Sequence, residues 1–391
     1  MRIVHVTTFL HPEHPGGAER LVASLSRAQA DAGHDVTVVT SGVPDAAPRE
    51  RRDGVRIVRH PVEPRVRGAR FLLAVARGTR RTLSTLSTQS GDRFDVLHAH
   101  QVGSASAALA ARDVARRRVF SFYAPYGAER AVERGAGPIE RVRNAAASAL
   151  DRRCLARAEL IHVLSDFSAA QVATIAPTRV DRVRTIRPGV DTAYSPGSIS
   201  EARARLSLPL DGARLFTVRR LVKRMGLDDA VDAVGSLVSR GADVCLDIAG
   251  AGPEEASLRD RIHGHGLEER VRLLGRVEEE ALADHYRAAD LFLLPTRALE
   301  GFGMVTLEAL ASGTPVIATD VGATPEVLGH WLPDAPCVAP GAAPLSAAIM
   351  SGLERREPLR RAARAAADRL RVEANWSVVA QRMTELYREE S

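Results

Sequence analysis

Short apolar runs alternate with longer amphipathic segments along the chain of 391 residues. The runs have the length of buried parallel strands, whereas the segments between them repeat apolar residues at helical spacing. Predicted strands cover residues 2–7, 36–40, 55–59 (an edge strand), 95–99, 119–122, 160–164, 183–186, 215–218, 244–249, 271–274, 291–294 and 316–318. This alternation indicates an α/β fold with mainly parallel sheets and helices on both faces.

The length is sufficient for two α/β domains, each with its own core. The segment 194–198, with the sequence YSPGS, has the composition of a linker, and we place the domain boundary there. The expected division is residues 1–195, 196–375 and a last helical segment, 376–391. No apolar run reaches membrane-spanning length and the sequence opens directly with a strand, so we expect a cytoplasmic protein without a signal peptide.

The segment 290–328 carries the most specific pattern, DLFLLPTRALEGFGMVTLEALASGTPVIATDVGATPEVL. It predicts a strand, a loop, a helix from about Phe302 and a second strand, with Gly313 closing the helix. Gly301 and Gly303 leave backbone N–H groups uncovered at the helix N-terminus, where a diphosphate can accept hydrogen bonds and meet the positive end of the helix dipole.

Two glutamates flank the start of this helix. Glu308 lies two turns into it and is expected to accept hydrogen bonds from the two hydroxyls of a ribose. Glu300 directly precedes the helix, where a sugar beyond the diphosphate would lie. The alternative is an ordinary strand–helix connection with solvated carboxylates.

The string E-G-F-G-x4-E-A-x-A-x-G-x-P-V-I-A resembles the donor-site signature of the family 4 glycosyltransferases. The resemblance implies the GT-B fold, in which two Rossmann-like doubly wound domains face each other across a cleft. It implies retaining transfer of a sugar from a nucleotide-diphosphate donor, with UDP-hexose or UDP-N-acetylhexosamine as the donor class. The domain 1–195 would bind the acceptor and the domain 196–375 the nucleotide sugar, and the helix in 376–391 would return to the first domain.

Further residues match motifs of this family. Gly16, Gly17 and Glu19 match its G-G-x-E loop, which faces the donor phosphates and the acceptor. Such a glycine pair ahead of a helix also lets the backbone approach a ligand closely. Glu300 would position the donor sugar. The other matching donor-binding positions are Gly250, Gly252, Pro253, Gly275, Arg276, Val277, Phe302, Met304 and Val305.

The loop after the first strand of the second domain departs from the family pattern. It reads R-R-L-V-K-R-M-G against G-R-L-x3-K-G. Arg220 matches the arginine that would bind the diphosphate as charge builds on the leaving group. Arg219 replaces the glycine, and Met225 stands where the phosphate-binding lysine is expected. Arg224 or Lys223 could supply the second cation, and we favour Arg224 because its guanidinium fork suits phosphate oxygens.

Tyr123 stands where the family usually carries a histidine near the donor sugar. A tyrosine can hydrogen-bond a sugar hydroxyl but cannot take over the proton chemistry of histidine near neutral pH. His100, at the C-terminal end of a predicted strand, is a candidate acceptor-site residue, and His98 within the strand is expected to be structural.

No Asp-x-Asp sequence occurs, so we expect neither a metal-bridged diphosphate nor a cofactor. The helix dipole, Arg220 and Arg224 would stabilise the diphosphate in place of a metal. His11 and His14 could form a metal pair, but no third ligand is nearby and two prolines interrupt the loop, which favours ordinary loop histidines.

Residues 1–195 carry thirty arginines against nineteen acidic residues, whereas the remainder is net acidic. This basic half suggests an anionic acceptor, an anionic lipid surface or nucleic acid. The alternative is compositional bias, since Lys223 is the only lysine. The amphipathic helix predicted at 70–87 either packs on the core with a solvated basic face or contacts the inner face of an anionic membrane.

The leading hypothesis is therefore a metal-independent, retaining hexosyltransferase acting on a sugar, a lipid-linked acceptor or a small molecule. A GT-B sugar phosphorylase or a nucleotide-sugar epimerase is the alternative; a pyridoxal-dependent phosphorylase would need Lys223 as its Schiff-base residue, in a different motif. A basic, non-catalytic anion-binding module is a third hypothesis. With aromatic residues at 4%, the chain lacks the aromatic interleaving of a nucleic-acid-binding protein.

Overall fold

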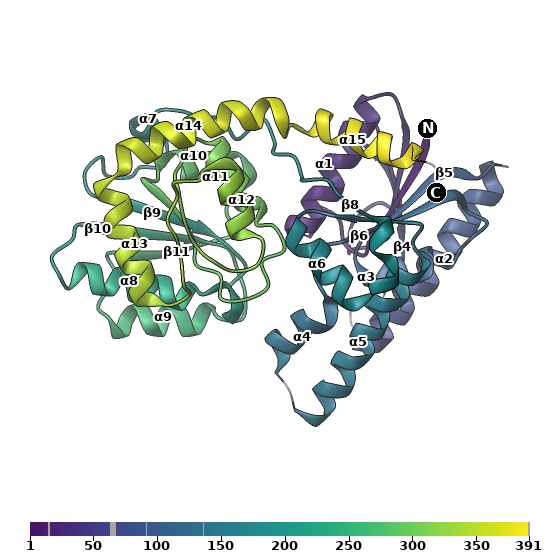
Figure 1. Ribbon diagram of the computed structural model, residues 1–391, viewed down its shortest axis with the longest axis horizontal. Helices are drawn as coiled ribbons and strands as arrows, with labels where there is room; N and C mark the ends of the chain where they lie inside the picture. The colour runs from purple at the N-terminus through teal and green to yellow at the C-terminus, as the bar shows by residue number, and fades with distance from the viewer. Residues whose placement is uncertain (15, 63–67, 91, 136, 390–391) are drawn as a thin grey trace. The chain divides into compact units, whose positions relative to one another are not determined.

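The computed structural model describes residues 1–14, 16–62, 68–90, 92–135 and 137–389. They form two compact units, which we describe separately (Figure 1). The first unit combines Met1–Gly189 with the segment from Trp376 onward, and the second is Val190–Asn375. The chain therefore leaves the first unit once and returns to it with its last helix. Residues 390–391 of the predicted C-terminal segment lie outside the described residues.

Among the described residues, the first unit contains an eight-stranded sheet in the order β3-β4-β2-β1-β5-β6-β7-β8. Neighbouring strands are parallel, except that β3 pairs antiparallel with β4 at the edge. Because the chain returns from β4 to β5 beside β1, the strand order reverses between β1 and β5. The strands are β1 Arg2–Val6, β2 Asp35–Ser41, β3 Arg49–Arg52, β4 Val55–His60, β5 Phe94–Ala99, β6 Ala115–Phe122, β7 Leu160–Val163 and β8 Val183–Thr185.

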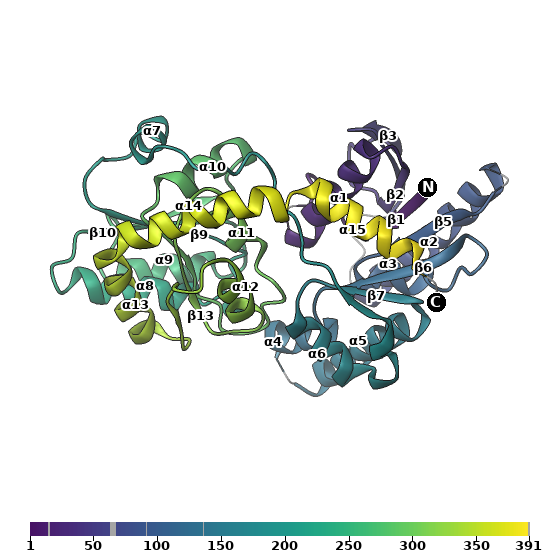
Figure 2. The same ribbon diagram turned by 45° about the horizontal axis from the view of Figure 1, so that its top comes forward.

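Helices cover both faces of this sheet. Helices α1 and α15 contact each other on one face, as both views show (Figure 2). Helices α2, α3, α5 and α6 contribute to the apolar core on the opposite face, together with Val4, Leu97 and Phe120. The helices are α1 Gly17–Asp31, α2 Gly68–Ser90, α3 Val102–Ala108, α4 Tyr126–Arg134, α5 Pro138–Arg157, α6 Asp166–Ile175 and α15 Trp376–Arg388, with the 3-10 helix η1 Pro177–Arg182.

The apolar stripe of α2 is buried in the first unit. Val75, Thr79 and Leu83 have no exposed surface, and the helix contacts α3, β2 and β4. The exposed residues of α2 include its arginines Arg70, Arg77, Arg80 and Arg81. The predicted helix 70–87 therefore packs on the core with part of its apolar stripe and keeps a basic face in solvent. Contact of that face with an anionic membrane stays a prediction.

The second unit contains a six-stranded, parallel sheet within the described part of the chain, in the order β11-β10-β9-β12-β13-β14. The chain moves outward from β9 to β11 and then returns to β12 beside β9, so the order reverses between β9 and β12. The strands are β9 Ala213–Val218, β10 Val244–Ala249, β11 Val271–Gly275, β12 Leu291–Leu294, β13 Val316–Thr319 and β14 Cys337–Val338. The α/β class predicted from the sequence is confirmed in both units.

Both faces of the second sheet are covered by helices, which is why β12 reads as the continuous apolar run LFLL. Leu291 and Leu293 belong to the core with α8, α9 and α13, while Phe292 packs on Tyr286 of α10 and Phe216. The helices are α7 Ile199–Arg205, α8 Leu227–Val238, α9 Glu255–Gly264, α10 Glu279–Ala288, α11 Met304–Ala311, α12 Thr324–Trp331, α13 Ala342–Glu354 and α14 Arg356–Glu373, with the 3-10 helix η2 Lys223–Met225.

The two ends of the second unit meet where the chain enters and leaves it. The N–H of Val190 donates to the carbonyl of Ala374 at 2.8 Å, and Val190 also forms a parallel bridge with Asn375. Within the described residues, no helix has both the length and the hydropathy needed to span a membrane.

Asp151 of α5 is buried beside the start of α4. It is 1% exposed, and its Oδ2 accepts a hydrogen bond from the N–H of Gly127 at 3.2 Å. Burial raises the pKa of Asp151 from 3.8 to about 6, because the backbone hydrogen bonds offset only part of the desolvation of the carboxylate. The folded protein therefore binds this proton more tightly than the unfolded chain, and its stability falls as the pH rises from about 3.8 through 6.

We predict that Asp151→Asn stabilises the protein at pH 7.5. The amide keeps an acceptor for Gly127 without a buried charge, so the free energy of unfolding should rise by about 1–3 kcal/mol. The gain should shrink strongly at pH 4, where the carboxyl of the unmodified protein is protonated in the folded state. Urea denaturation at the two pH values measures this difference, and an equal effect at both values would contradict the prediction.

Candidate active site

A buried ion pair between Arg219 and Glu300 joins two loops at the carboxyl edge of the second sheet. Arg219 directly follows β9 and Glu300 lies in the loop after β12, so the pair spans the two strands between which the sheet order reverses. Arg219 Nη2 lies 2.5 Å from Glu300 Oε2, and the two residues are 8% and 7% exposed. In open α/β sheets, ligands bind at this position, outside the carboxyl ends of the strands where the order reverses.

Neighbouring groups hold this ion pair in place. Arg219 Nη2 also lies 3.2 Å from Thr296 Oγ1 and 2.7 Å from Met225 Sδ. Thr296 Oγ1 donates to Glu300 Oε2 at 2.9 Å. A buried charge pair is favourable only where further hydrogen bonds accompany the ion contact, and Thr296 supplies one to each partner.

The backbone of Glu300 is fixed by the loop that follows β13. The N–H of Ala323 donates to the Glu300 carbonyl at 2.9 Å. Gly322 has a φ of 65°, and a Cβ atom there would lie 2.1 Å from the same carbonyl oxygen. Only glycine allows this close approach, so the loops after β12 and β13 position Glu300 together.

Helix α11 begins at Met304, two residues later than the sequence predicts. Its N-cap, Gly303, has a φ of 78°, which is outside the helical region, and Phe302 before it is buried in the core. A Cβ atom at Gly303 would lie 3.6 Å from Glu300 Cδ, so the carboxylate lies next to the helix start. The first N–H groups of a helix have no partner within the helix, which makes this end suitable for an anion. Gly301, Met304 and Val305 are half-buried around it.

Glu308 is buried in α11 rather than solvated. It is 3% exposed, and the hydroxyl of Tyr286 donates to its Oε2 at 2.8 Å. Tyr286 has no exposed surface. A carboxylate accepts several hydrogen bonds, so this contact orients Glu308 and is compatible with the predicted ribose role, which remains a prediction.

The glycines of the loop after β10 allow it to pack on the loop after β9. A Cβ atom at Gly250 would lie 1.8 Å from the Arg219 carbonyl oxygen, and one at Gly252 would lie 2.4 Å from that of Leu221. The N–H of Gly250 donates to the carbonyl of Gly275 at 2.7 Å. These predicted donor-binding glycines therefore fix the loop that carries Arg219 and Arg220. Of their neighbours, Pro253 and Arg276 are exposed and Val277 is half-buried.

The candidate cations of the β9 loop differ in exposure. The side chains of Arg220 and Lys223 are exposed. Arg224 is 9% exposed, and its Nη1 donates to the carbonyl of Leu299 at 3.0 Å. Arg224 thus holds the loop that carries Glu300. Its predicted contact with a phosphate is not tested by this geometry.

In the first unit, Gln101 links the two loops at the β1–β5 reversal. Its Oε1 accepts hydrogen bonds from the N–H groups of Thr8 and Phe9 at 3.0 and 2.9 Å. Its Nε2 donates to Glu19 Oε1 at 2.6 Å. A Cβ atom at Gly16 would lie 2.1 Å from Glu19 Oε2, so Glu19 folds back over the glycine at the start of α1. Gly17, the first residue of this helix, is exposed.

Tyr123 and His100 lie together at the carboxyl edge of the first sheet. The Tyr123 hydroxyl is 2.7 Å from His100 Nδ1, and His100 Nε2 is 3.0 Å from His5 Nδ1. Burial raises the pKa of Tyr123, and the nearby charge of Glu19 raises it further. The structure therefore brings the predicted residues Glu19, His100 and Tyr123 to one edge of the sheet, beside the glycine pair.

Two family models match the chain, one in each unit. The model for Glycosyltransferase Family 4 covers residues 15–194, and that for Glycosyl transferases group 1 covers residues 198–369. D-inositol 3-phosphate glycosyltransferase 1 of Catenulispora acidiphila is 32% identical over 327 aligned residues, which cover 78% of this chain and 75% of that protein. The glycogen synthase of Mycobacterium tuberculosis is 29% identical over 401 aligned positions, covering 99% and 94% of the two chains.

The chain belongs to the family 4 glycosyltransferases.

The solved structures agree with the GT-B fold. Sucrose-phosphate synthase from Thermosynechococcus elongatus superposes with a TM-score of 0.85 at 22% identity, covering 99% of this chain and 98% of that one. Its similarity supports the fold alone, at this level of identity. Each unit of the glycosyltransferase has the parallel, doubly wound architecture of a GT-B domain.

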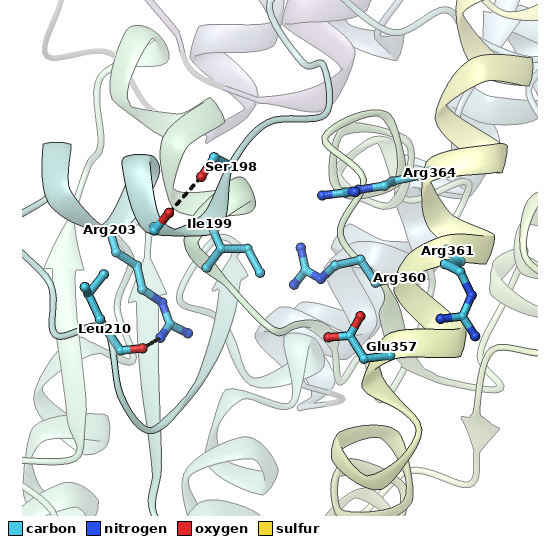
Figure 3. Close-up of a pocket in the computed structure, with 9 residues that line it drawn as sticks. Ser198, Ile199, Arg203, Leu210, Glu357, Arg360, Arg361 and Arg364 are labelled. Atoms are coloured by element: carbon cyan, nitrogen blue, oxygen red, sulfur yellow. Dashed lines mark hydrogen bonds between the residues drawn. The ribbon is translucent and has the colours of Figure 1, made fainter.

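A cavity of about 510 Å³ in the second unit of the glycosyltransferase lies at the other edge of the sheet (Figure 3). Arg360 of α14 points toward Ile199, and Leu210 and Arg203 complete the wall. Arg203 pairs with Asp290 at 2.8 Å, directly ahead of β12, so the cavity adjoins the amino ends of the strands. None of the predicted donor-site residues lines it.

Several residues that contact the predicted site residues of this glycosyltransferase are not indicated by the sequence. Arg219 and Met225 were recognised only as departures from the family motif, yet their side chains are in contact. Two positions six residues apart in one loop both differ from the family motif, and such a double difference can indicate that the two side chains contact each other. Tyr286 and Gln101 gave no signal, because each belongs to a segment with no recognisable motif.

We predict that Arg219→Met destabilises the second unit. The substitution leaves the buried Glu300 carboxylate without its cation, and breaking a buried pair in this way costs about 3 kcal/mol or more. Arg220→Met is the matched control, because the adjacent side chain is exposed and should change the free energy of unfolding by less than about 0.5 kcal/mol. Urea denaturation of the full chain measures both, and equal midpoints for the two variants would refute the structural role of the pair.

Proposed function

We propose that this glycosyltransferase moves a hexose or N-acetylhexosamine from a UDP-linked donor to a hydroxyl of a sugar, a lipid-linked acceptor or a small molecule. The transfer would retain the anomeric configuration and need no metal. The observation that carries the proposal is the buried Arg219–Glu300 pair, which holds a carboxylate beside the open N-terminus of α11 at the reversal point of the sheet.

The donor diphosphate would bind at the start of α11. Backbone N–H groups there and the positive end of the helix dipole favour an anion. The exposed Arg220 side chain, on the adjacent loop, would add a positive charge that stabilises the leaving diphosphate. Glu308, oriented by Tyr286, would accept hydrogen bonds from the ribose, and the backbone at 275–277 would contact the base.

Glu300 would position the donor sugar rather than attack it. Its Oε2 is already engaged by Arg219 and Thr296, which makes it a fixed hydrogen-bond acceptor and a poor nucleophile. In such a retaining reaction without a protein nucleophile, the departing phosphate oxygen would take the proton of the acceptor hydroxyl. Preorganised charges around the diphosphate would then supply most of the stabilisation of the transition state.

The nature of the donor is supported by known relatives. A solved Anabaena protein with a TM-score of 0.75 and 19% identity was crystallised with UDP-glucose. A mannosyltransferase of Mycobacterium tuberculosis that is 37% identical over 152 residues is named for GDP-mannose. UDP-glucose is the donor we expect, and GDP-mannose is the comparison that a test must include.

We predict that the protein releases UDP from UDP-glucose faster than it releases GDP from GDP-mannose, and that EDTA leaves this release unchanged. Arg220→Met and Glu300→Gln should each lower kcat/KM about 100-fold or more, as expected for groups that stabilise the transition state. Arg240→Met, which removes an exposed arginine of the same unit, should remain within about twofold. Coupled detection of the released nucleotide measures these rates.

Two results would contradict the proposal. Loss of activity in EDTA, restored by a divalent cation, would exclude the metal-independent reaction. Full activity of Glu300→Gln would exclude the assigned site. Product analysis by NMR of the anomeric proton tests retention separately.

A further inference from the structure

One face of the first sheet carries a row of polar side chains under α1 and α15. His5, His98, Ser121 and His162 stand on the adjacent strands β1, β5, β6 and β7, and each is at most 2% exposed. His5 is in register with His98, and Ser121 with His162. Their chain neighbours, such as Val4 and Phe120, belong to the apolar core on the other face. A buried polar row across four central strands needs internal hydrogen-bond partners.

These residues form one continuous chain of eight hydrogen bonds with side chains from both covering helices. Gln29 comes from α1 and Tyr387 from α15. The groups follow one another in the order Tyr123, His100, His5, Gln29, Tyr387, His98, Ser121, His162 and the carbonyl of Ile186. The heavy-atom distances between successive groups in this order are 2.7, 3.0, 2.7, 3.2, 2.7, 2.7, 2.8 and 2.9 Å.

The far end of the chain fixes the direction of its second half. The Ile186 carbonyl can only accept, so His162 donates from Nε2 and must accept at Nδ1 from the Ser121 hydroxyl. Ser121 has then used its proton, so it accepts from His98 Nε2, and His98 Nδ1 accepts from the Tyr387 hydroxyl. Each neutral group has one proton to give, and this determines the next bond.

The same reasoning continues to the edge of the sheet. Tyr387 has used its proton, so its oxygen accepts from Gln29 Nε2, which leaves Gln29 Oε1 to accept from His5 Nε2. His5 Nδ1 accepts from His100 Nε2, and His100 Nδ1 accepts from Tyr123. All eight bonds therefore point from Tyr123 toward Ile186.

The assignment requires neutral histidines, and burial makes them so. Burial lowers the pKa of His5 and His162 to about 4, and it lowers the pKa of His98 and His100 well below the ordinary value. A proton cannot leave through the far end, because a carbonyl does not take one up. The chain is consequently a polarising and orienting device and not a proton path.

His5, His98 and His100 also lie close enough for one metal ion. All six of their ring nitrogens, however, take part in the hydrogen bonds of the chain. A bound ion would break at least two of these bonds, because His5 Nδ1 and His100 Nε2 share one bond, and His98 would lose either Tyr387 or Ser121 as its partner. The hydrogen-bonded chain explains the cluster without a metal.

We propose that Tyr387 of α15 is a positioning residue that acts on Tyr123 through this one-directional chain. The chain makes the Tyr123 hydroxyl donate its proton to His100. The Tyr123 oxygen can then only accept a hydrogen bond from a substrate hydroxyl. The inference rests on the proposed function, in which that hydroxyl belongs to the sugar or the acceptor. It gives Tyr123 a defined role where the family usually has a histidine: it is an acceptor-only contact. Hydrogen bonds that share one direction strengthen one another. Loss of the Tyr387 hydroxyl should therefore weaken the hydrogen bond from Tyr123 to His100.

The test uses Tyr387→Phe with Thr384→Val as its matched control. Thr384 is on the same helix, is 8% exposed, and hydrogen-bonds Ala380 and His34 outside the chain. Both substitutions delete one buried hydroxyl from α15, but only the first interrupts the path to Tyr123. A general weakening of the packing of α15 on the first unit would therefore affect both variants equally in each measurement.

The first measurement is the tautomeric state of the histidines by nitrogen NMR of the full chain labelled with 15N-histidine at pH 7.5. The unmodified protein should show His5, His98, His100 and His162 neutral and protonated at Nε2. Tyr387→Phe should give His5 and His100 mixed tautomers, and Thr384→Val should leave them unchanged. A charged ring or an Nδ1-protonated form at any of the four in the unmodified protein would overturn the proposal.

The second measurement is a double-mutant cycle in nucleotide release from UDP-glucose. Tyr387→Phe should lower kcat/KM about 3- to 10-fold, in line with one hydrogen bond, and Thr384→Val should stay within twofold. In a Tyr123→Phe background, Tyr387→Phe should have no further effect. Additive losses would overturn the positioning role. If the unmodified protein released no nucleotide, the proposed function would fail, while the tautomers would still decide whether Tyr387 orients Tyr123.

Discussion

The structure of the second unit depends on a charge pair that is buried where the sheet reverses its order. Two loops from strands far apart in sequence, after β9 and after β12, meet there, and each also buries apolar side chains such as Leu221, Met225 and Phe302. The contact between Arg219 and Glu300 supplies the connection, and Thr296 bonds to both partners. Around it, Gly250, Gly252 and Gly322 allow backbones to approach within distances that a side chain would forbid.

In the first unit, an amide side chain joins the loops at the point where the strand order reverses. Gln101 accepts from the loop after β1 and donates to Glu19, which ties the start of α1 to the end of β5. Behind this edge, a neutral chain of histidines and hydroxyls fills the sheet face. Both units thus place polar contacts where an α/β fold binds its ligands.

The sequence was sufficient to predict most strands of both sheets, because fully buried parallel strands read as short apolar runs. Strands β3 and β14 were missed, since the four charged residues RERR and a strand of two residues show no apolar strand pattern. The start of α11 was placed two residues early: the left-handed Gly303 ends the loop, and a glycine alone does not indicate its own dihedral angles.

Candidate site residues could be predicted from the sequence where a motif is continuous along the chain, as at 300–308. It failed where the chemistry is made by residues that meet only in the fold, such as Arg219 with Glu300 or Tyr286 with Glu308. The histidine chain shows this most clearly. His98 looked like a single structural histidine within a strand, and its role depends on Tyr387, which lies 289 positions away. Contacts between residues so far apart in the chain cannot be predicted from the spacing of residues in the sequence.

The most direct measurement is a calorimetric titration of the full chain with UDP and with uridine, and with GDP and guanosine as the parallel pair. If the N-terminus of α11 and the loop fixed by Arg219 bind a diphosphate, one of the two diphosphates should bind at least about 100-fold more tightly than its nucleoside, a difference of roughly 2.7 kcal/mol, and this difference should shrink as salt is added. Equal affinities within each pair would show that the base and ribose carry the binding, and would contradict a phosphate site at this helix.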